Sequence, residues 1–215
     1  LLLQGCSALR ERPAPLPEAL AHEAVIPGIA QARYWGDEPP RGFADWLALP
    51  DETLRTRYGG IMHRSHEYLL VSGGGAEGAF GAGLLAGWSE AGDRPDFEMV
   101  TGISTGALIA PFAFLGPAFD ERQREVYTRY GTDDLVKPRG LWQIVRGDAA
   151  VDTGPLRALI ERYLDDATIA LIAAEGRKGR SLLVGTTQLD AARPVIWDIT
   201  AIAASGEPGA ADLIR

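Results

Sequence analysis

The chain has 215 residues, of which 46% are hydrophobic and 23% are charged, a balance typical of a folded globular domain with a large core. Its net charge of −8 provides no basic surface for nucleic acid, so we exclude nucleic-acid binding as a function class. We also see no internal repeat and no cluster of metal-ligating residues, and we expect no cofactor.

The amino end suggests where the protein resides. An apolar run ends in Gln4-Gly5-Cys6, which resembles the end of a bacterial lipoprotein signal peptide, where lipidation occurs on the cysteine. No starting Met or basic segment precedes it, so we expect the signal to be incomplete, and Ser7 suits sorting to the outer membrane. The alternative is that Cys6 is an ordinary thiol in a frayed terminus. Three prolines in residues 10–17 predict an extended tether, and we assign residues 1–24 to signal remnant and tether.

The first glycine-rich turn follows a predicted strand at residues 68–72. It precedes a predicted helix at residues 79–91, whose large apolar side chains recur at helical spacing. Consecutive glycines let backbone N–H groups converge on one point without obstruction, which favours binding of an anion. An oxyanion hole is one use of such a turn. The candidate residues are Gly73, Gly74 and Gly75, followed by Gly78.

The second glycine-rich turn places Ser104 between a predicted strand at residues 97–101 and a predicted helix that starts at Thr105. Gly102 and Gly106 flank the serine and complete the G-x-S-x-G pattern of a nucleophile elbow. Glycine is needed there because the bend brings neighbouring backbone too close for side chains. The helix N-terminus favours the negative charge that develops as a serine attacks an acyl carbon. A plain glycine turn is the alternative.

Residues 99–119 carry no charge, so their length alone would permit a membrane span. Glycines and prolines interrupt the segment, and Pro111 inside a long helix would cost about 3 kcal/mol. We therefore predict a strand, an elbow and a buried helix. Further along, residues 120–130 and 155–164 predict amphipathic helices, the second with Asp152 or Thr153 as its N-cap.

Two other families use similar turns. Gly73, Gly75 and Gly78 also fit the G-x-G-x-x-G of a dinucleotide-binding fold, which needs an acidic residue at the end of the next strand. That strand ends in Thr101, which disfavours this interpretation. An α/β-hydrolase would place its histidine after the serine, whereas the chain's histidines, His22, His63 and His66, all precede Ser104.

The two glycine motifs in this order resemble those of the patatin-like phospholipases. The similarity spans about residues 65–215 and includes the segments at residues 185–190 and 194–198. It implies an α/β fold of three layers, α/β/α, with a mainly parallel central sheet, and we assign residues 25–215 to this hydrolase domain. It also implies a serine acyl hydrolase that acts on phospholipid or other lipid esters. Ser104 would be the nucleophile of a Ser-Asp dyad, and the oxyanion loop would be Gly73, Gly74 and Gly75.

The resemblance also predicts an aspartate in an Asp-Gly-Gly or Asp-Gly-Ala motif, but the chain contains no Asp-Gly pair. A helix is predicted to start at Ala210 and has no stop signal before Arg215, so we expect the protein to continue and the motif to follow. Asp190 at a predicted hairpin tip and Asp198 on its far strand do not match the motif. Glu77, where the family usually has Arg or Lys, would disfavour an oxyanion unless it faces solvent or pairs with Arg64. A catalytically inactive lipid-binding relative is therefore the alternative function.

Overall fold

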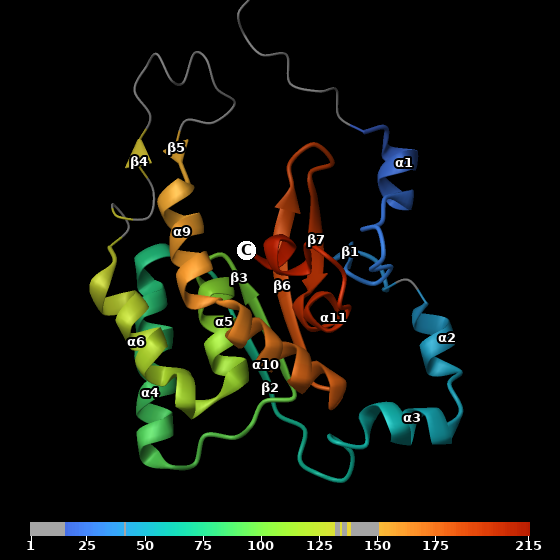
Figure 1. Ribbon diagram of the computed structural model, residues 1–215, viewed down its shortest axis with the longest axis horizontal. Coiled ribbons are helices and arrows are strands. Elements are labelled where there is room, and N and C mark those ends of the chain that lie inside the picture. Colours follow the sequence, from blue (N-terminus) through green and yellow to red (C-terminus); the bar gives the residue numbers. More distant parts are fainter. Residues whose placement is uncertain (1–15, 41, 132–133, 135–136, 139–150) are drawn as a thin grey trace, which may run out of the picture.

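The structure is a computed structural model that describes residues 16–40, 42–131, 134, 137–138 and 151–215. Its centre is a five-stranded sheet (Figure 1). Three strands pair in parallel, with β3 (Met99–Ile103) between β2 (Tyr68–Val71) and β6 (Ser181–Gln188). Strand β7 (Arg193–Asp198) runs antiparallel to β6 and to the edge strand β1 (Arg33–Trp35), so four of the five strands share one direction. The sheet order is β1, β7, β6, β3 and β2.

Helices connect the parallel strands. One helix, α4, leads from β2 to β3, and the path from β3 to β6 contains α5, α6, α9 and α10. The predicted α/β class with a mainly parallel sheet is therefore confirmed. The bounds are α4 (Gly78–Ala91), α5 (Thr105–Leu115), α6 (Asp120–Arg129), α9 (Gly154–Tyr163), α10 (Asp166–Arg177), α11 (Ile199–Ala204) and α12 (Ala210–Ile214), with short 3₁₀ turns η1 (Gly75–Glu77) and η2 (Pro117–Phe119).

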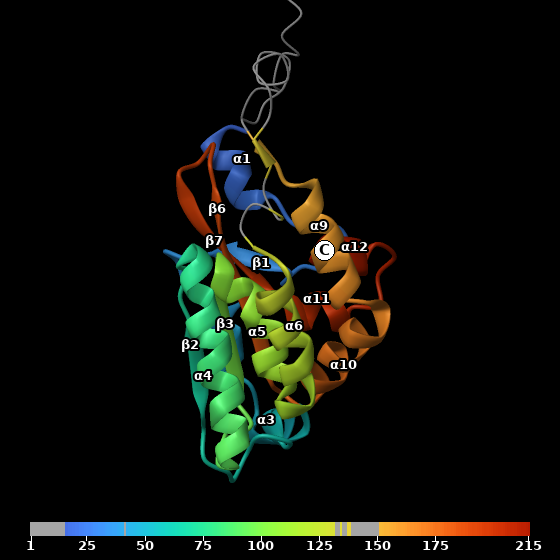
Figure 2. The ribbon, with the colours of Figure 1, turned by 90° about the vertical axis from the view of Figure 1, so that its left-hand side faces the viewer.

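The core lies between one face of the sheet and these helices. Alternate residues of a strand point to opposite faces, and Val100 of β3 and Leu182 of β6 lie on the helix-covered face with no exposed surface. On the other face Tyr68, Leu70 and Ile103 keep 56%, 75% and 56% of their surface exposed, so in the described part of the chain no helix covers these positions. In Figure 2, α5, α6 and α10 lie to the right of β2 and β3.

The uncharged segment at residues 99–119 folds into β3, the turn at Ser104, α5 and η2. Helix α5 is buried along most of its length, as predicted, and it accommodates Pro111 in its interior. Among the helices of the described residues, none combines the length and apolar character needed to cross a bilayer.

At the amino-terminal end, β1 pairs with β7 and forms the sheet edge, a strand that the sequence patterns did not predict. The helices of this region are α1 (Glu18–Glu23), α2 (Phe43–Leu47) and α3 (Asp51–Tyr58). Arg193 of β7 lies over the Trp35 ring, 4.4 Å from its centroid, and donates hydrogen bonds to Asp37 and Glu38. The hydrogen bond from Arg193 lowers the pKa of Asp37. A separate two-stranded ribbon pairs β4 (Lys137–Pro138) with β5 (Val151–Asp152).

Candidate active site

Ser104 occupies a strained turn between β3 and α5. Its backbone angles are φ 55° and ψ −124°, and a positive φ is uncommon for a residue with a side chain. Such a conformation costs about 1–3 kcal/mol and persists only where the surrounding structure enforces it. The serine is exposed, so the turn presents its hydroxyl to solvent. This is the strand-to-helix geometry of a nucleophile elbow.

Backbone contacts on both sides of the serine enforce the turn. A Cβ atom added to Gly102 would lie 2.4 Å from the carbonyl oxygen of Gly106. One added to Gly106 would lie 2.2 Å from the carbonyl oxygen of Val71 and 2.8 Å from that of Ser72. Backbone atoms cannot rotate away as a flexible side chain can, so only glycine fits at positions 102 and 106.

The first glycine turn lies directly beside Ser104. A Cβ atom on Gly73 would be 2.9 Å from Ser104 Cβ and 3.4 Å from its Oγ. Gly73, Gly74 and Gly75 are exposed, and within the described residues no hydrogen bond uses the N–H of any of them as its donor. The two turns, about 30 residues apart in the chain, thus bring a hydroxyl and available N–H groups to one place.

Thr105 joins the two turns, a role that sequence reasoning missed. Its Oγ1 donates a hydrogen bond of 2.9 Å to the carbonyl oxygen of Gly75, and its Cγ2 would be 2.0 Å from a Cβ on Gly78. The Tyr127 hydroxyl donates to the carbonyl oxygen of Thr105 at 3.2 Å. Burial raises the pKa of Tyr127 to about 12, so this donor keeps its proton at neutral pH. The sequence could not predict this role, because the hydrogen bond from Thr105 to Gly75 joins two turns that are far apart in the chain.

The hydroxyl of Ser104 is not used to cap α5, although serine commonly does so at a helix start. Ser104 is the N-cap residue of α5 but accepts no capping hydrogen bond through its side chain. Two other helices differ, because Asp165 caps α10 and Asp198 caps α11 through their carboxylates. The Ser104 hydroxyl therefore remains available for chemistry.

Neither downstream aspartate approaches Ser104. Asp198 Oδ1 accepts hydrogen bonds from Ala201 N at 2.8 Å and from Thr200 Oγ1 at 2.5 Å. Through Leu183 it pairs in register with Thr101, which places it two strands across and about 10 Å back along the strand direction, roughly 14 Å from Ser104. Asp190 lies in the turn after β6, roughly 13 Å past the level of Ser104. In the described part of the chain, no side chain hydrogen-bonds to the Ser104 hydroxyl.

The sequence analysis also singled out Glu77 and Cys6. Glu77 is exposed, which meets one of the two conditions under which its charge is compatible with an oxyanion. Arg64 does not pair with Glu77. Its Nε lies 3.7 Å from Glu98 Oε1, and its Nη2 donates a hydrogen bond to the carbonyl oxygen of Asp96. Cys6, the predicted lipidation site, lies outside the described residues.

Comparison with protein families gives a match to residues 69–207, which fit the family described as Patatin-like phospholipase. The matched segment contains both glycine turns and most of the sheet. The chain belongs to the patatin-like phospholipase family. Membership in the patatin-like family places it among lipid acyl hydrolases and agrees with the mixed α/β architecture. Comparisons with curated proteins and with solved structures gave no significant match.

Proposed function

We propose that the protein hydrolyses acyl esters of phospholipids or related lipids, with Ser104 as the nucleophile. The observation that carries this proposal is the contact between the two turns, in which a Cβ on Gly73 would lie 2.9 Å from Ser104 Cβ. An ester carbonyl attacked by Ser104 Oγ would develop its negative charge next to the N–H groups of Gly73, Gly74 and Gly75. Removing one such donor typically costs a factor of about 10²–10³ in turnover.

The reaction needs a base to take the serine proton. In the dyad implied by the family resemblance, an aspartate accepts the proton as Oγ bonds to the acyl carbon, and the oxyanion collapses with departure of the alcohol, which leaves with that proton. Water, deprotonated by the same aspartate, then attacks the acyl carbon; the carboxylic acid departs as the bond to Ser104 Oγ breaks, and the aspartate returns the proton to Oγ. Since Asp190 and Asp198 lie far from the serine, we propose that the base is outside the described residues, in the Asp-Gly motif expected after Arg215.

Kinetics of the full-length protein test this assignment. With p-nitrophenyl butyrate as substrate, Ser104→Ala is expected to abolish hydrolysis. Changing the aspartate of the Asp-Gly motif to Asn is expected to lower turnover at least about a hundredfold, the lower end of what a positioned general base supplies. Hydrolysis retained by Ser104→Ala would remove the serine from its proposed role.

An inactive lipid-binding relative is the second candidate, and the observation that favours it is the missing partner for the Ser104 hydroxyl among the described residues. The two candidates differ in one measurement. If the full-length protein floats with phospholipid vesicles, and so binds them, but hydrolyses no ester, lipid binding is the better account of its function.

We also propose that the protein is an outer-membrane lipoprotein of the bacterial envelope, anchored through Cys6. Helix α1 supports this proposal by its position: His22 lies 3.0 Å from Arg193, which pairs with Gln188 at the end of β6. That is the edge of the sheet to which β3 delivers Ser104, so an anchor before α1 would hold the serine near the membrane. With its complete signal peptide, the protein should fractionate with outer membranes, and Cys6→Ser should release it or leave it unprocessed. A soluble wild-type protein with an unmodified cysteine would contradict the anchor.

A further inference from the structure

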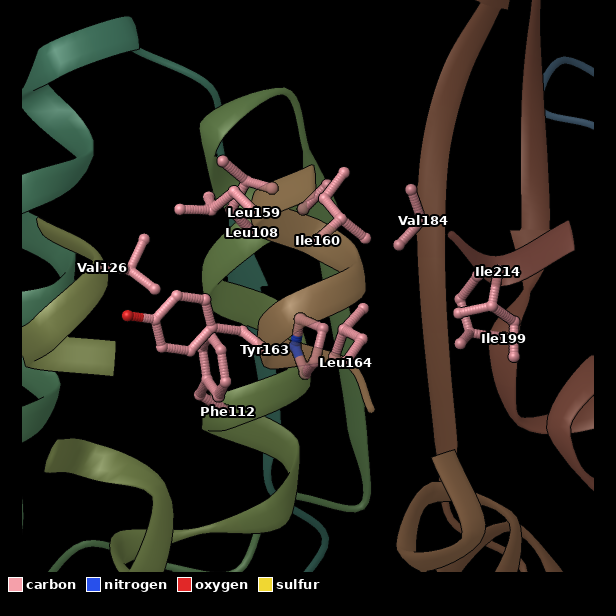
Figure 3. A pocket seen from close by; sticks show the side chains of 12 residues that line it. Leu108, Phe112, Val126, Leu159, Ile160, Tyr163, Leu164, Val184, Ile199 and Ile214 are labelled. Atoms are coloured by element: carbon pink, nitrogen blue, oxygen red, sulfur yellow. The ribbon is translucent and has the colours of Figure 1, made fainter. Parts of the chain in front are cut away.

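An apolar cavity of about 140 Å³ lies between α5 and β6. Helices α6, α9, α11 and α12 complete its wall, and every lining side chain is a hydrocarbon except the phenol of Tyr163. Figure 3 shows Leu108 and Phe112 of α5 and Ile160 of α9 on one side, with Val184 of β6 opposite. A cavity with this lining favours an uncharged, apolar occupant.

The cavity begins on the helix that carries Ser104. Ala107, Leu108 and Pro111 line it, and they follow Ser104 by three, four and seven positions. Residues at these intervals share one face of a helix. With a rise of 1.5 Å per residue, Leu108 is about 6 Å along the axis from Ser104. A chain attached at the serine thus has a short path along this face into the cavity.

Exposure of the lining residues shows that the cavity is accessible near Ser104. Leu108, Ile160 and Val184, toward the serine, are half-buried, as are Leu164 and Ile214 farther along, whereas Phe112 and Tyr163 are buried with 2% and 5% exposure.

We propose that this cavity receives the acyl chain of the ester that Ser104 attacks, and that it holds about six carbons, since an apolar cavity of about 150 Å³ accommodates one benzene molecule. The inference rests on the proposed function and adds a substrate preference: esters of short acyl chains over long ones. The chain would enter along α5 past Leu108, with its carbonyl carbon at Ser104.

Kinetics with p-nitrophenyl esters from acetate to laurate test this preference in the full-length protein. We expect kcat/KM to rise about fourfold per methylene up to hexanoate, as expected for burial of each group, and to fall for octanoate and laurate. Ile160→Phe fills the cavity and should lower the ratio of kcat/KM for hexanoate to that for acetate about tenfold. Ile160→Ala enlarges it and should move the maximum to octanoate. Leu171→Ala in α10 is the control, because Leu171 is an exposed aliphatic residue that does not line the cavity.

Binding separates failure of this inference from failure of the proposed function. Calorimetry with hexanoate uses Ser104→Ala, which needs no turnover, and the double variant with Ile160→Phe. If no ester is hydrolysed but hexanoate binds and Ile160→Phe removes that binding, the cavity assignment stands and the hydrolase proposal fails. An active enzyme whose chain-length profile is the same in Ile160→Phe and wild type would overturn the cavity assignment alone. Absence of both hydrolysis and hexanoate binding would overturn both.

Discussion

The two glycine-rich turns are held in place by different forces. At the serine turn, Gly102 and Gly106 lie against backbone carbonyl groups and leave no room for a side chain. At the other turn, Gly75 has a φ of 56° but no neighbouring atom within 4 Å of an added Cβ, and the Thr105 hydroxyl donates a hydrogen bond to its carbonyl. Close packing against backbone thus fixes the nucleophile, whereas Gly75 of the predicted oxyanion loop is unpacked and is joined to the serine turn by a side-chain hydrogen bond.

Breaking the packed turn should have the largest effect. Gly106→Ala would place Cβ 2.2 Å from the Val71 carbonyl oxygen, and overpacking against backbone should cost about 3 kcal/mol or more. We expect little folded protein, measured by circular dichroism and thermal unfolding. Gly87→Ala is the control, because no atom lies within 4 Å of its added Cβ in α4; it should raise stability by up to about 1 kcal/mol. A fully stable Gly106→Ala protein would contradict the close packing.

Breaking the link between the turns should have the next largest effect, and on turnover rather than on folding. Thr105→Val keeps the methyl group beside Gly78 but removes the donor to the Gly75 carbonyl oxygen. We expect kcat to fall about tenfold, equivalent to about 1.4 kcal/mol, with KM unchanged, because the loop stabilises the transition state more than the bound ester. Thr105→Ser should restore kcat. If Val and Ser variants behave alike, the hydrogen bond does not position the loop.

A methyl group in the loop itself should have a smaller effect. Gly75→Ala meets no steric obstacle, so it should lower the free energy of unfolding only by the cost of a left-handed residue, about 1–2 kcal/mol. Urea titration measures this difference. A loss as large as that of Gly106→Ala would show that both turns are packed alike, and the contrast drawn above would be wrong.

The smallest expected effects on stability compare two N-cap residues. Ser104 does not cap α5 through its side chain, whereas Asp165 caps α10 through its carboxylate. Asp165→Ala should cost about 1 kcal/mol at neutral pH, whereas Ser104→Ala removes no capping bond and should leave the melting temperature nearly unchanged. Hydrogen bonds from the hydroxyl and N–H of Thr168 lower the pKa of Asp165. Its contribution is therefore present above the unfolded pKa of about 3.9 and is lost as pH falls through the lower folded value. Below that pH, wild type and Asp165→Ala should unfold alike.

The elements nearest the site could be predicted because local patterns define them. Helices α4 and α9 begin at Gly78 and Gly154, each one residue before its predicted start. Strand β3 spans residues 99–103, two residues later than predicted, because a side chain occupies the hydrogen-bonding position of the backbone before it. The Phe97 carbonyl accepts hydrogen bonds from the Arg180 guanidinium, a residue 83 positions away that no local pattern can reveal.

The amino-terminal elements and the link between the turns could not be predicted, since both depend on distant partners. Strand β1 has three residues, pairs with β7, and buries Trp35 against Arg193. Helices α2 and α3 bury no residue, so they carry no clear apolar stripe. The G-x-S-x-G spacing predicted the turn at Ser104, but the approach of Gly73 to the serine depends on the pairing of β2 with β3.

Covalent labelling of Ser104 tests the central claim most directly. The full-length protein is treated with a fluorophosphonate probe, which reacts with activated serines, and the modified peptide is identified by mass spectrometry. The account predicts a single adduct on Ser104, absent from Ser104→Ala. An adduct on another serine, or no adduct in a folded full-length protein, would contradict it.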